Sequence, residues 1–143
     1  MSARCSTLLL SMAVAACVGC SSSDVTRYDV SGTVTFDGQP VPSGSITFQP
    51  AAGNSGPGGY ATIKDGKFDT AIDGKGTTGG PHYASISGYD GIADPGNEKP
   101  FGAPLFDAYR TQVDLPKGPS TQSFEVPATA KPKPQVVNPN QQA

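Results

Sequence analysis

The sequence predicts an all-β fold, an antiparallel seven-strand β-sandwich, and three observations lead to it. Short segments in which apolar and polar residues alternate recur from residue 28 to residue 126. Glycine, proline and Asp-Gly pairs separate these segments, as is typical of strands joined by tight turns. No segment shows the 3.6-residue apolar period of a helix. Antiparallel sheets keep one face in water, so a chain with 36% apolar residues can still form a core.

The first expected strand covers residues 28–36. Its apolar residues share one face, because side chains alternate along a strand; they are Tyr28, Val30, Val34 and Phe36. Asp37-Gly38 follows as a turn. The next segment, 39–42, contains two prolines that cannot donate backbone hydrogen bonds, so we expect an edge or connecting segment there.

Six further strands are expected at 45–49, 60–64, 67–72, 82–87, 109–115 and 121–126. The strands 60–64 and 67–72 flank Asp65-Gly66, which predicts a hairpin with a type I′ turn. Alternation predicts which side chains point inward: Ile46, Phe48, Ala84, Ile86, Tyr109, Val113, Leu115, Phe124 and Val126.

The first nineteen residues have the layout of a secretory signal peptide. A basic residue, Arg4, precedes a run of small and apolar residues at 6–16, and cysteines follow. The apolar run is shorter than the roughly 20 residues that span a bilayer. The cysteines make the leader resemble a bacterial lipoprotein signal, which implies export and a lipid anchor in the cell membrane or the outer membrane.

Two cysteines are candidates for lipidation. Cys17 follows Val14, Ala15 and Ala16, an aliphatic residue and two small ones, which resembles a lipobox. Cys20 also follows a small residue, but Cys17 stands where an aliphatic residue is usual, so we favour Cys17. The alternative is an ordinary signal peptide that leaves free cysteines. No cysteine follows Cys20, so the exported domain needs its own core without disulfides.

Composition predicts one domain at 24–127 and a disordered tail at 128–143 that is rich in Pro and Gln. The domain carries twelve acidic and seven basic residues, a net charge of −5, with no basic cluster. Nucleic acid is therefore not an expected partner, because its binding depends on Lys and Arg. We expect contact with the membrane through the anchor, an envelope protein or glycan as partner, and no cofactor.

The segment 30–46, with its Asp-Gly turn followed by Pro-Val and glycine, resembles the opening of carboxypeptidase regulatory-like domains. These domains share a transthyretin-like sandwich, and the segment 80–86 resembles a later strand of the family. The resemblance covers residues 30–126 and implies a non-catalytic accessory or binding module on a small lipoprotein. Gly32 would let a neighbouring backbone approach closely. The long segment 88–106 departs from the simplest family pattern.

His82 is the one histidine, and no Gly-x-Ser-x-Gly motif accompanies it. A lone histidine on a strand is usually structural, so a hydrolase remains a remote alternative. The transthyretin-like hydrolase of the purine pathway needs several histidines and a terminal Tyr-Arg-Gly-Ser sequence. Here Tyr109-Arg110 continues with Thr111-Gln112 and is not terminal, so that similarity fails.

The segment 88–106 is the expected functional surface, because irregular loops of this length are usually functional or disordered. Its aromatic residues Tyr89, Phe101 and Phe106 would contact a sugar ring or a protein partner if exposed, as in a carbohydrate-binding accessory module. Alternatively, Phe101 and Phe106 fold back over the open end of the core. The spacing of an EF-hand is absent and no metal site is predicted; the best carboxylates for calcium would be Asp90, Asp94 and Glu98.

Overall fold

The computed structural model describes residues 24–132. The leader with Cys17 and Cys20, and residues 133–143 of the tail, lie outside this range. Among the described residues, no helix is long and apolar enough to cross a membrane.

Nine strands, one helical turn and two short 3-10 helices follow one another along the described chain. The elements are β1 (Val30–Phe36), β2 (Gln39–Pro40), β3 (Ser43–Pro50), β4 (Gly59–Lys64), β5 (Lys67–Asp69), α1 (Thr70–Asp73), β6 (Gly74–Lys75), β7 (Gly80–Tyr89), η1 (Pro95–Asn97), β8 (Tyr109–Leu115), β9 (Ser120–Val126) and η2 (Ala128–Ala130).

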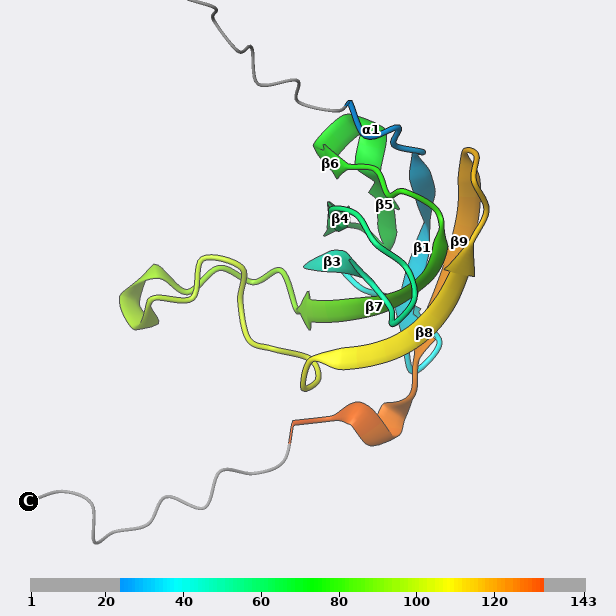
Figure 1. Ribbon diagram of the computed structural model, residues 1–143. Coiled ribbons are helices and arrows are strands. Elements are labelled where there is room, and N and C mark those ends of the chain that lie inside the picture. The colour runs from blue at the N-terminus through cyan, green and yellow to red at the C-terminus, as the bar shows by residue number, and fades with distance from the viewer. Residues whose placement is uncertain (1–23, 133–143) are drawn as a thin grey trace, which may run out of the picture.

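The strands form one sheet that curls into a half-barrel (Figure 1). Its main path runs β9, β1, β5, β4, β3, β7 and β8, while β2 pairs with the end of β1 and β6 pairs with β4. The predicted all-β class is confirmed. One pairing differs from the antiparallel pattern expected: β9 lies parallel to β1, from Val30 opposite Ser120 to Phe36 opposite Val126.

Gly32 is required for the parallel pairing of β1 with β9. Its φ of 155° is unfavourable for other residues, and a Cβ there would lie 1.7 Å from the backbone oxygen of Gln122. The expected close approach at Gly32 is therefore present, and the approaching backbone belongs to β9.

Both Asp-Gly pairs form the turns that the sequence predicts. The φ angles are 50° and 76° at Asp37-Gly38, and 50° and 72° at Asp65-Gly66. Positive φ at both central residues is the mark of a type I′ hairpin turn. The first turn joins β1 to β2 and the second joins β4 to β5.

The expected strand 67–72 is wrong beyond Asp69, where the chain turns into α1. The Asp69 carboxylate caps this turn by accepting a hydrogen bond from Ala71 N at 2.9 Å. The Thr70 hydroxyl accepts one from Val30 N at 2.9 Å. The local Asp69 cap and the long-range Thr70–Val30 bond take the place of a sheet ladder, and Ile72 is left 83% exposed.

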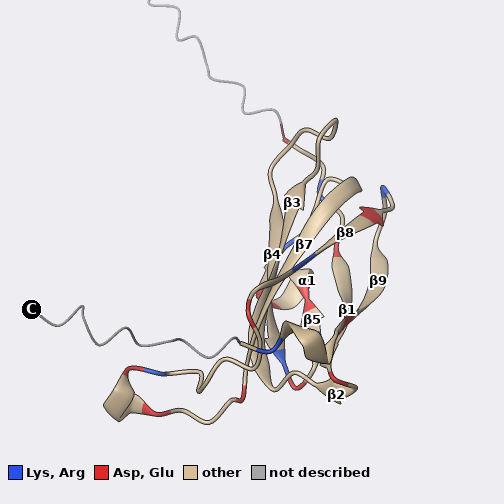
Figure 2. Cartoon of the chain, turned by 90° about the horizontal axis from the view of Figure 1, so that it is seen from below, with Lys and Arg blue, Asp and Glu red and all other residues tan. Residues whose placement is uncertain are grey.

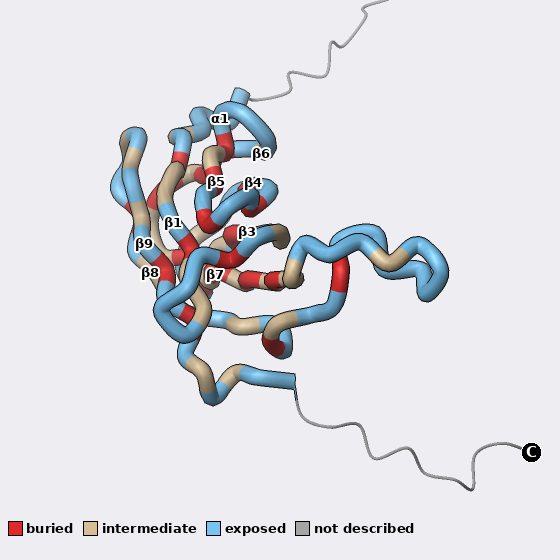
Figure 3. Tube along the Cα trace, turned by 180° about the vertical axis from the view of Figure 1, so that it is seen from behind, coloured by how far each residue is buried: buried red, intermediate tan, exposed pale blue. Residues whose placement is uncertain are grey.

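The core fills the inside of the curl (Figure 3), where the buried segments face one another. Phe48, Phe68 and Phe124 come from three strands and pack with ring centroids 6.0 to 6.2 Å apart. The residues predicted to point inward are buried or pack against this core. Burial of this kind contributes about 1.5–3 kcal/mol for each large apolar side chain.

The described start of the chain is held at one end of the sheet. Tyr28 and Thr77 exchange two backbone hydrogen bonds of 2.7 and 2.9 Å. The Arg27 guanidinium donates to the carbonyl oxygens of Gly58 and Gly76 at 2.9 and 2.7 Å. The first described residues therefore lie beside the start of β1.

The other end of the described chain continues past the predicted domain boundary. Ala128, the expected first residue of the disordered tail, begins η2. Asp107 N donates to Ala130 O at 2.9 Å, and Ala130 packs against the core. The ordered domain therefore includes η2, which covers the sheet end opposite the N-terminal segment (Figure 1).

Candidate functional site

Residues 90–104 form an ordered arm that projects from the sheet between β7 and β8 (Figure 1). Its two sides are joined by backbone hydrogen bonds from Asp90 N to Ala103 O and from Gly91 N to Phe101 O, at 3.0 and 3.1 Å. Farther out, Asp94 and Lys99 exchange bonds of 2.9 and 3.1 Å. The segment expected to be irregular is therefore a ribbon with η1 at its tip.

Asp90 ties the two sides of the arm together at its base. One carboxylate oxygen, Oδ1, accepts from Ile92 N at 2.9 Å and from Ala103 N at 3.1 Å. Gly102 makes room for this carboxylate: its φ is 91°, and a Cβ would lie 1.8 Å from Oδ1. Asp90 was a candidate ligand residue, and its observed contacts are within the arm.

The remaining candidate carboxylates lie toward the tip (Figure 2). Asp94 accepts a hydrogen bond from the Asn97 amide at 2.7 Å, and Glu98 ends η1 with a left-handed φ of 56°. Within residues 24–132, no three His, Cys, Asp or Glu side chains gather in a way that could hold a metal ion. The structure therefore does not bring Asp90, Asp94 and Glu98 together.

The three aromatic candidates separate into two environments. Phe106 is 3% exposed and packs against Phe36 with ring centroids 5.0 Å apart. Gly88 makes space for it, because a Cβ there would lie 2.6 Å from the ring. Phe106 therefore covers the end of the core and is not part of the candidate binding surface.

Phe101 and Tyr89 stay at the surface. Phe101 is 59% exposed, Tyr89 is half-buried, and their ring centroids lie 6.0 Å apart. Ile92, which the sequence did not suggest as a binding residue, is 72% exposed on the same arm. An exposed aliphatic residue in a loop carries no sequence signal, because only the fold shows that nothing covers it.

Hollows flank the base of the arm on two sides. One, of about 340 Å³, is lined by Phe101, Asp90, Pro42 and the β4–β5 turn. The other, of about 320 Å³, lies beside Leu105 and the β1–β2 turn. Their sizes lie at the lower end of the range for small-molecule pockets, about 300–1,000 Å³.

The arm and the N-terminal segment lie at opposite ends of the sheet (Figures 1 and 2). The arm follows Tyr89, the last residue of β7, while Tyr28 of the N-terminal segment pairs with Thr77, just before β7 begins. β7 has ten residues, and a strand rises about 3.3 Å per residue, so the two ends are about 30 Å apart.

His82 lies inside the sheet with no exposed surface. Its Nδ1 donates to Gly80 O at 2.9 Å and lies 3.4 Å from the Asn54 amide nitrogen, and its Nε2 is buried without a partner. These contacts hold a turn in place and offer no surface to a substrate.

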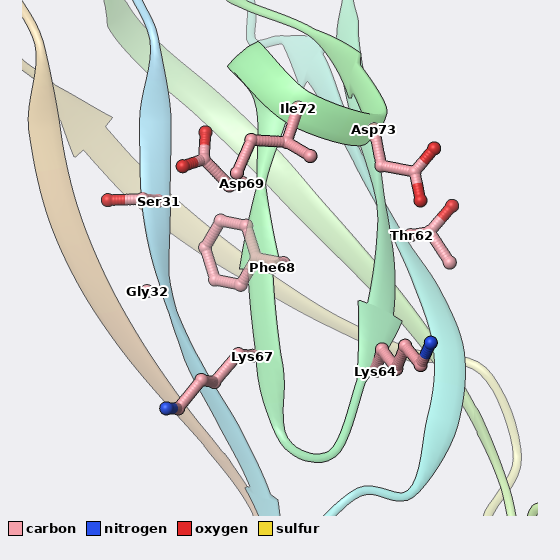
Figure 4. Close-up of a pocket in the computed structure, with 9 residues that line it drawn as sticks. All are labelled: Ser31, Gly32, Thr62, Lys64, Lys67, Phe68, Asp69, Ile72 and Asp73. Atoms are coloured by element: carbon pink, nitrogen blue, oxygen red, sulfur yellow. The ribbon is translucent and has the colours of Figure 1, made fainter.

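A further hollow, of about 420 Å³, lies on the outer face of β1, β4 and β5 beside α1 (Figure 4). Sequence reasoning missed it, because it exists only where α1 rises from a strand that was expected to continue to Ile72.

The chain matches no protein-family model and no curated protein sequence. The function is therefore inferred from the fold and from the positions of the arm and the hollows.

Proposed function

We propose that this protein is a lipid-anchored binding module of the cell envelope, with no catalytic role, which presents the arm away from the membrane. The observation that carries the proposal is the separation of the arm from the N-terminal segment by the length of the sheet. A lipid on Cys17 or Cys20 would hold the opposite end of the sheet at the bilayer.

Contacts of the N-terminal segment support a defined orientation. Arg27 and Tyr28 are bonded to residues beside the ends of β4, β6 and β7, so the tether between Cys20 and the first of these bonded residues is short. Two or more acyl chains hold a protein firmly at a bilayer, whereas a single chain binds it marginally. The arm would then project into the space where envelope partners lie.

Exposed apolar side chains favour a binding role for the arm. Ile92 and Phe101 are largely exposed although most of their surface is apolar. Their exposure adds little to the stability of the fold, since only buried apolar area contributes. Phe101 also lines one of the hollows beside the arm, and exposed apolar groups that cluster in this way mark sites of protein interaction.

A carbohydrate-binding role is the second candidate, and the Tyr89–Phe101 pair favours it. Aromatic faces at the surface bind the apolar faces of sugar rings, and Asp90 lies at the edge of the same hollow.

The proposal includes membership of the carboxypeptidase regulatory-like, transthyretin-like group of sandwiches. In support, the Asp37-Gly38 turn and the close approach at Gly32 occur where the resemblance suggests them. The rings of Phe48, Phe68 and Phe124 also pack across the inside of the curl, as facing sheets of a sandwich would.

Intact mass spectrometry of the mature protein from the membrane fraction tests the anchor. We expect lipid on the first residue, which would be Cys17, and its loss in Cys17→Ser but not in Cys20→Ser. Lipid lost in Cys20→Ser instead would move the anchor to Cys20. An unlipidated N-terminus in the natural chain would contradict the proposed anchor.

Photo-crosslinking in the living host tests the arm. A photoreactive amino acid at Ile92 is expected to give defined adducts, while the same group at the exposed Thr33 on β1 gives none. Equal labelling at both positions would argue against a specific role for the arm. A glycan array tests the second candidate, with binding expected to disappear in Phe101→Ala and to survive in Phe101→Tyr.

A further inference from the structure

We propose that the hollow beside α1 binds a zwitterion of about the size of a dipeptide. This inference rests on neither the lipid anchor nor the arm. The hollow has a volume of about 420 Å³ and combines charged, hydroxyl and apolar groups. Its lining residues are Ser31, Gly32, Thr62, Lys64, Lys67, Phe68, Asp69, Ile72 and Asp73.

Opposite charges occupy opposite ends of the hollow (Figure 4). Lys64 and Lys67 are cross-strand partners beside the turn that joins β4 to β5. Asp69 lies at the far end of β5, and Asp73 lies on α1. The hollow therefore has a cationic end near the β4–β5 turn and an anionic end where β5 meets α1.

Neither end is neutralised by a direct ion pair within residues 24–132. The single ion pair among them joins Lys131 to Asp37, with 4.0 Å between nitrogen and oxygen, and it lies outside this hollow. Like charges directly opposite one another on paired strands repel. The two side chains extend to opposite sides of the hollow (Figure 4), which separates their ammonium groups and leaves each lysine able to meet an anionic group.

The spacing of the charges suits a dipeptide. Lys67 and Asp69 are two residues apart on β5, about 7 Å along the strand. An extended dipeptide carries its amino and carboxyl groups about 5–7 Å apart. This separation is close to the spacing of Lys67 and Asp69 along the strand, and the long lysine side chain can span the remaining difference. Ile72, which is 83% exposed, offers an apolar wall for a ligand side chain.

The charge pattern disfavours ligands of a single sign. A polyanion would meet Asp69 and Asp73, and an adjoining hollow adds Asp29 to the same end. A polycation would meet Lys64 and Lys67. A ligand with a carboxylate and an ammonium group satisfies both ends, with the carboxylate at the lysines and the ammonium at the aspartates.

Nuclear magnetic resonance titration of the ¹⁵N-labelled full-length chain with alanyl-leucine tests the proposal. We expect saturable amide shifts in β1, β4 and β5, with a dissociation constant of about 1–10 mM, as suits exposed charges. N-acetyl-alanyl-leucine amide, which lacks both charges, is expected to cause no saturable shifts. Added salt should weaken binding, because it screens exposed charges.

Paired variants locate the two ends. Lys67→Gln and Asp73→Asn should each weaken binding about five-fold or more, while the matched controls Lys99→Gln and Asp114→Asn should leave it unchanged. Lys99 and Asp114 are exposed on the arm and on β8, away from the hollow. Equal thermal midpoints for all four variants would show that folding is unaffected.

Three results would overturn the proposal: no saturable shift with alanyl-leucine, equal binding of the capped dipeptide, or unchanged affinity in both Lys67→Gln and Asp73→Asn. None of these results bears on the anchor or the arm. Adducts at Ile92 and lipid at the N-terminus therefore remain separate tests of the proposed function.

Discussion

Phe101 and Phe106 belong to the same connection between β7 and β8, yet Phe101 is 59% exposed on the arm and Phe106 is 3% exposed against the core. The sheet is held by apolar side chains that pack inside the curl. The arm is held by backbone hydrogen bonds and by the Asp90 carboxylate. We therefore expect the side chains of the arm to add little to the stability of the core.

The largest effect is expected when Phe106 becomes Ala. Removing a buried aromatic side chain leaves a cavity and lowers the free energy of unfolding by about 3–5 kcal/mol. Phe101→Ala, the matched change on the arm, should lower it by less than about 1 kcal/mol. Urea unfolding of both variants measures the contrast, and similar losses in the two would show that the arm is part of the core.

Gly32→Ala is expected to have the next largest effect. Its new Cβ would collide with Gln122 O and separate β9 from β1, lowering the free energy of unfolding by about 2–4 kcal/mol. Gly118→Ala is the control, because no atom lies within 4 Å of its added Cβ. Thermal unfolding compares the two, and an unchanged midpoint in Gly32→Ala would contradict the close approach of β9.

Gly102→Ala should loosen the arm while the sheet stays folded. The added Cβ lies where Asp90 Oδ1 sits, so the bonds to Ile92 N and Ala103 N are lost. We expect amide hydrogen exchange in the arm to rise about ten-fold or more, with no comparable change in β3 or β7. Faster exchange across the whole sheet would mean that the arm and the sheet unfold together.

Ile92→Ser is expected to have the smallest effect on stability. The side chain is 72% exposed, so the free energy of unfolding should change by less than about 0.5 kcal/mol. Partner crosslinking from a neighbouring arm position should fall if Ile92 contacts the partner. A large loss of stability would instead place Ile92 in a contact that matters for folding.

Local patterns predicted the strands and turns well. Alternation identified Ile46, Phe48 and Phe124 as core residues, because a strand with one buried face repeats every two residues. Asp37-Gly38 and Asp65-Gly66 predicted their turns, since glycine adopts positive φ readily and Asp tolerates it. These features depend on neighbours in the sequence.

The candidate site was predicted less completely. The segment 88–106 was identified from its length and aromatic content, but its order depends on Asp90 contacting Ala103, a residue far along the chain. The hollow beside α1 was not predicted at all, because alternation continued through Ile72 while the Asp69 cap and the Thr70 bond ended β5. Only the Asp69 cap is local, and the Thr70 bond reaches Val30, 40 residues away, so the alternation could not show where β5 ends.

The sequence by itself determined most of the strands, the alternating side chains that face the core and the two Asp-Gly turns, because these properties arise from short-range sterics and alternation. The tertiary structure alone decided that β9 lies parallel to β1, that Phe106 is buried while Phe101 is exposed, and that the arm lies opposite the N-terminal segment. Those outcomes depend on which distant edges and surfaces meet when the sheet curls, and the sequence contains no local signal for that choice.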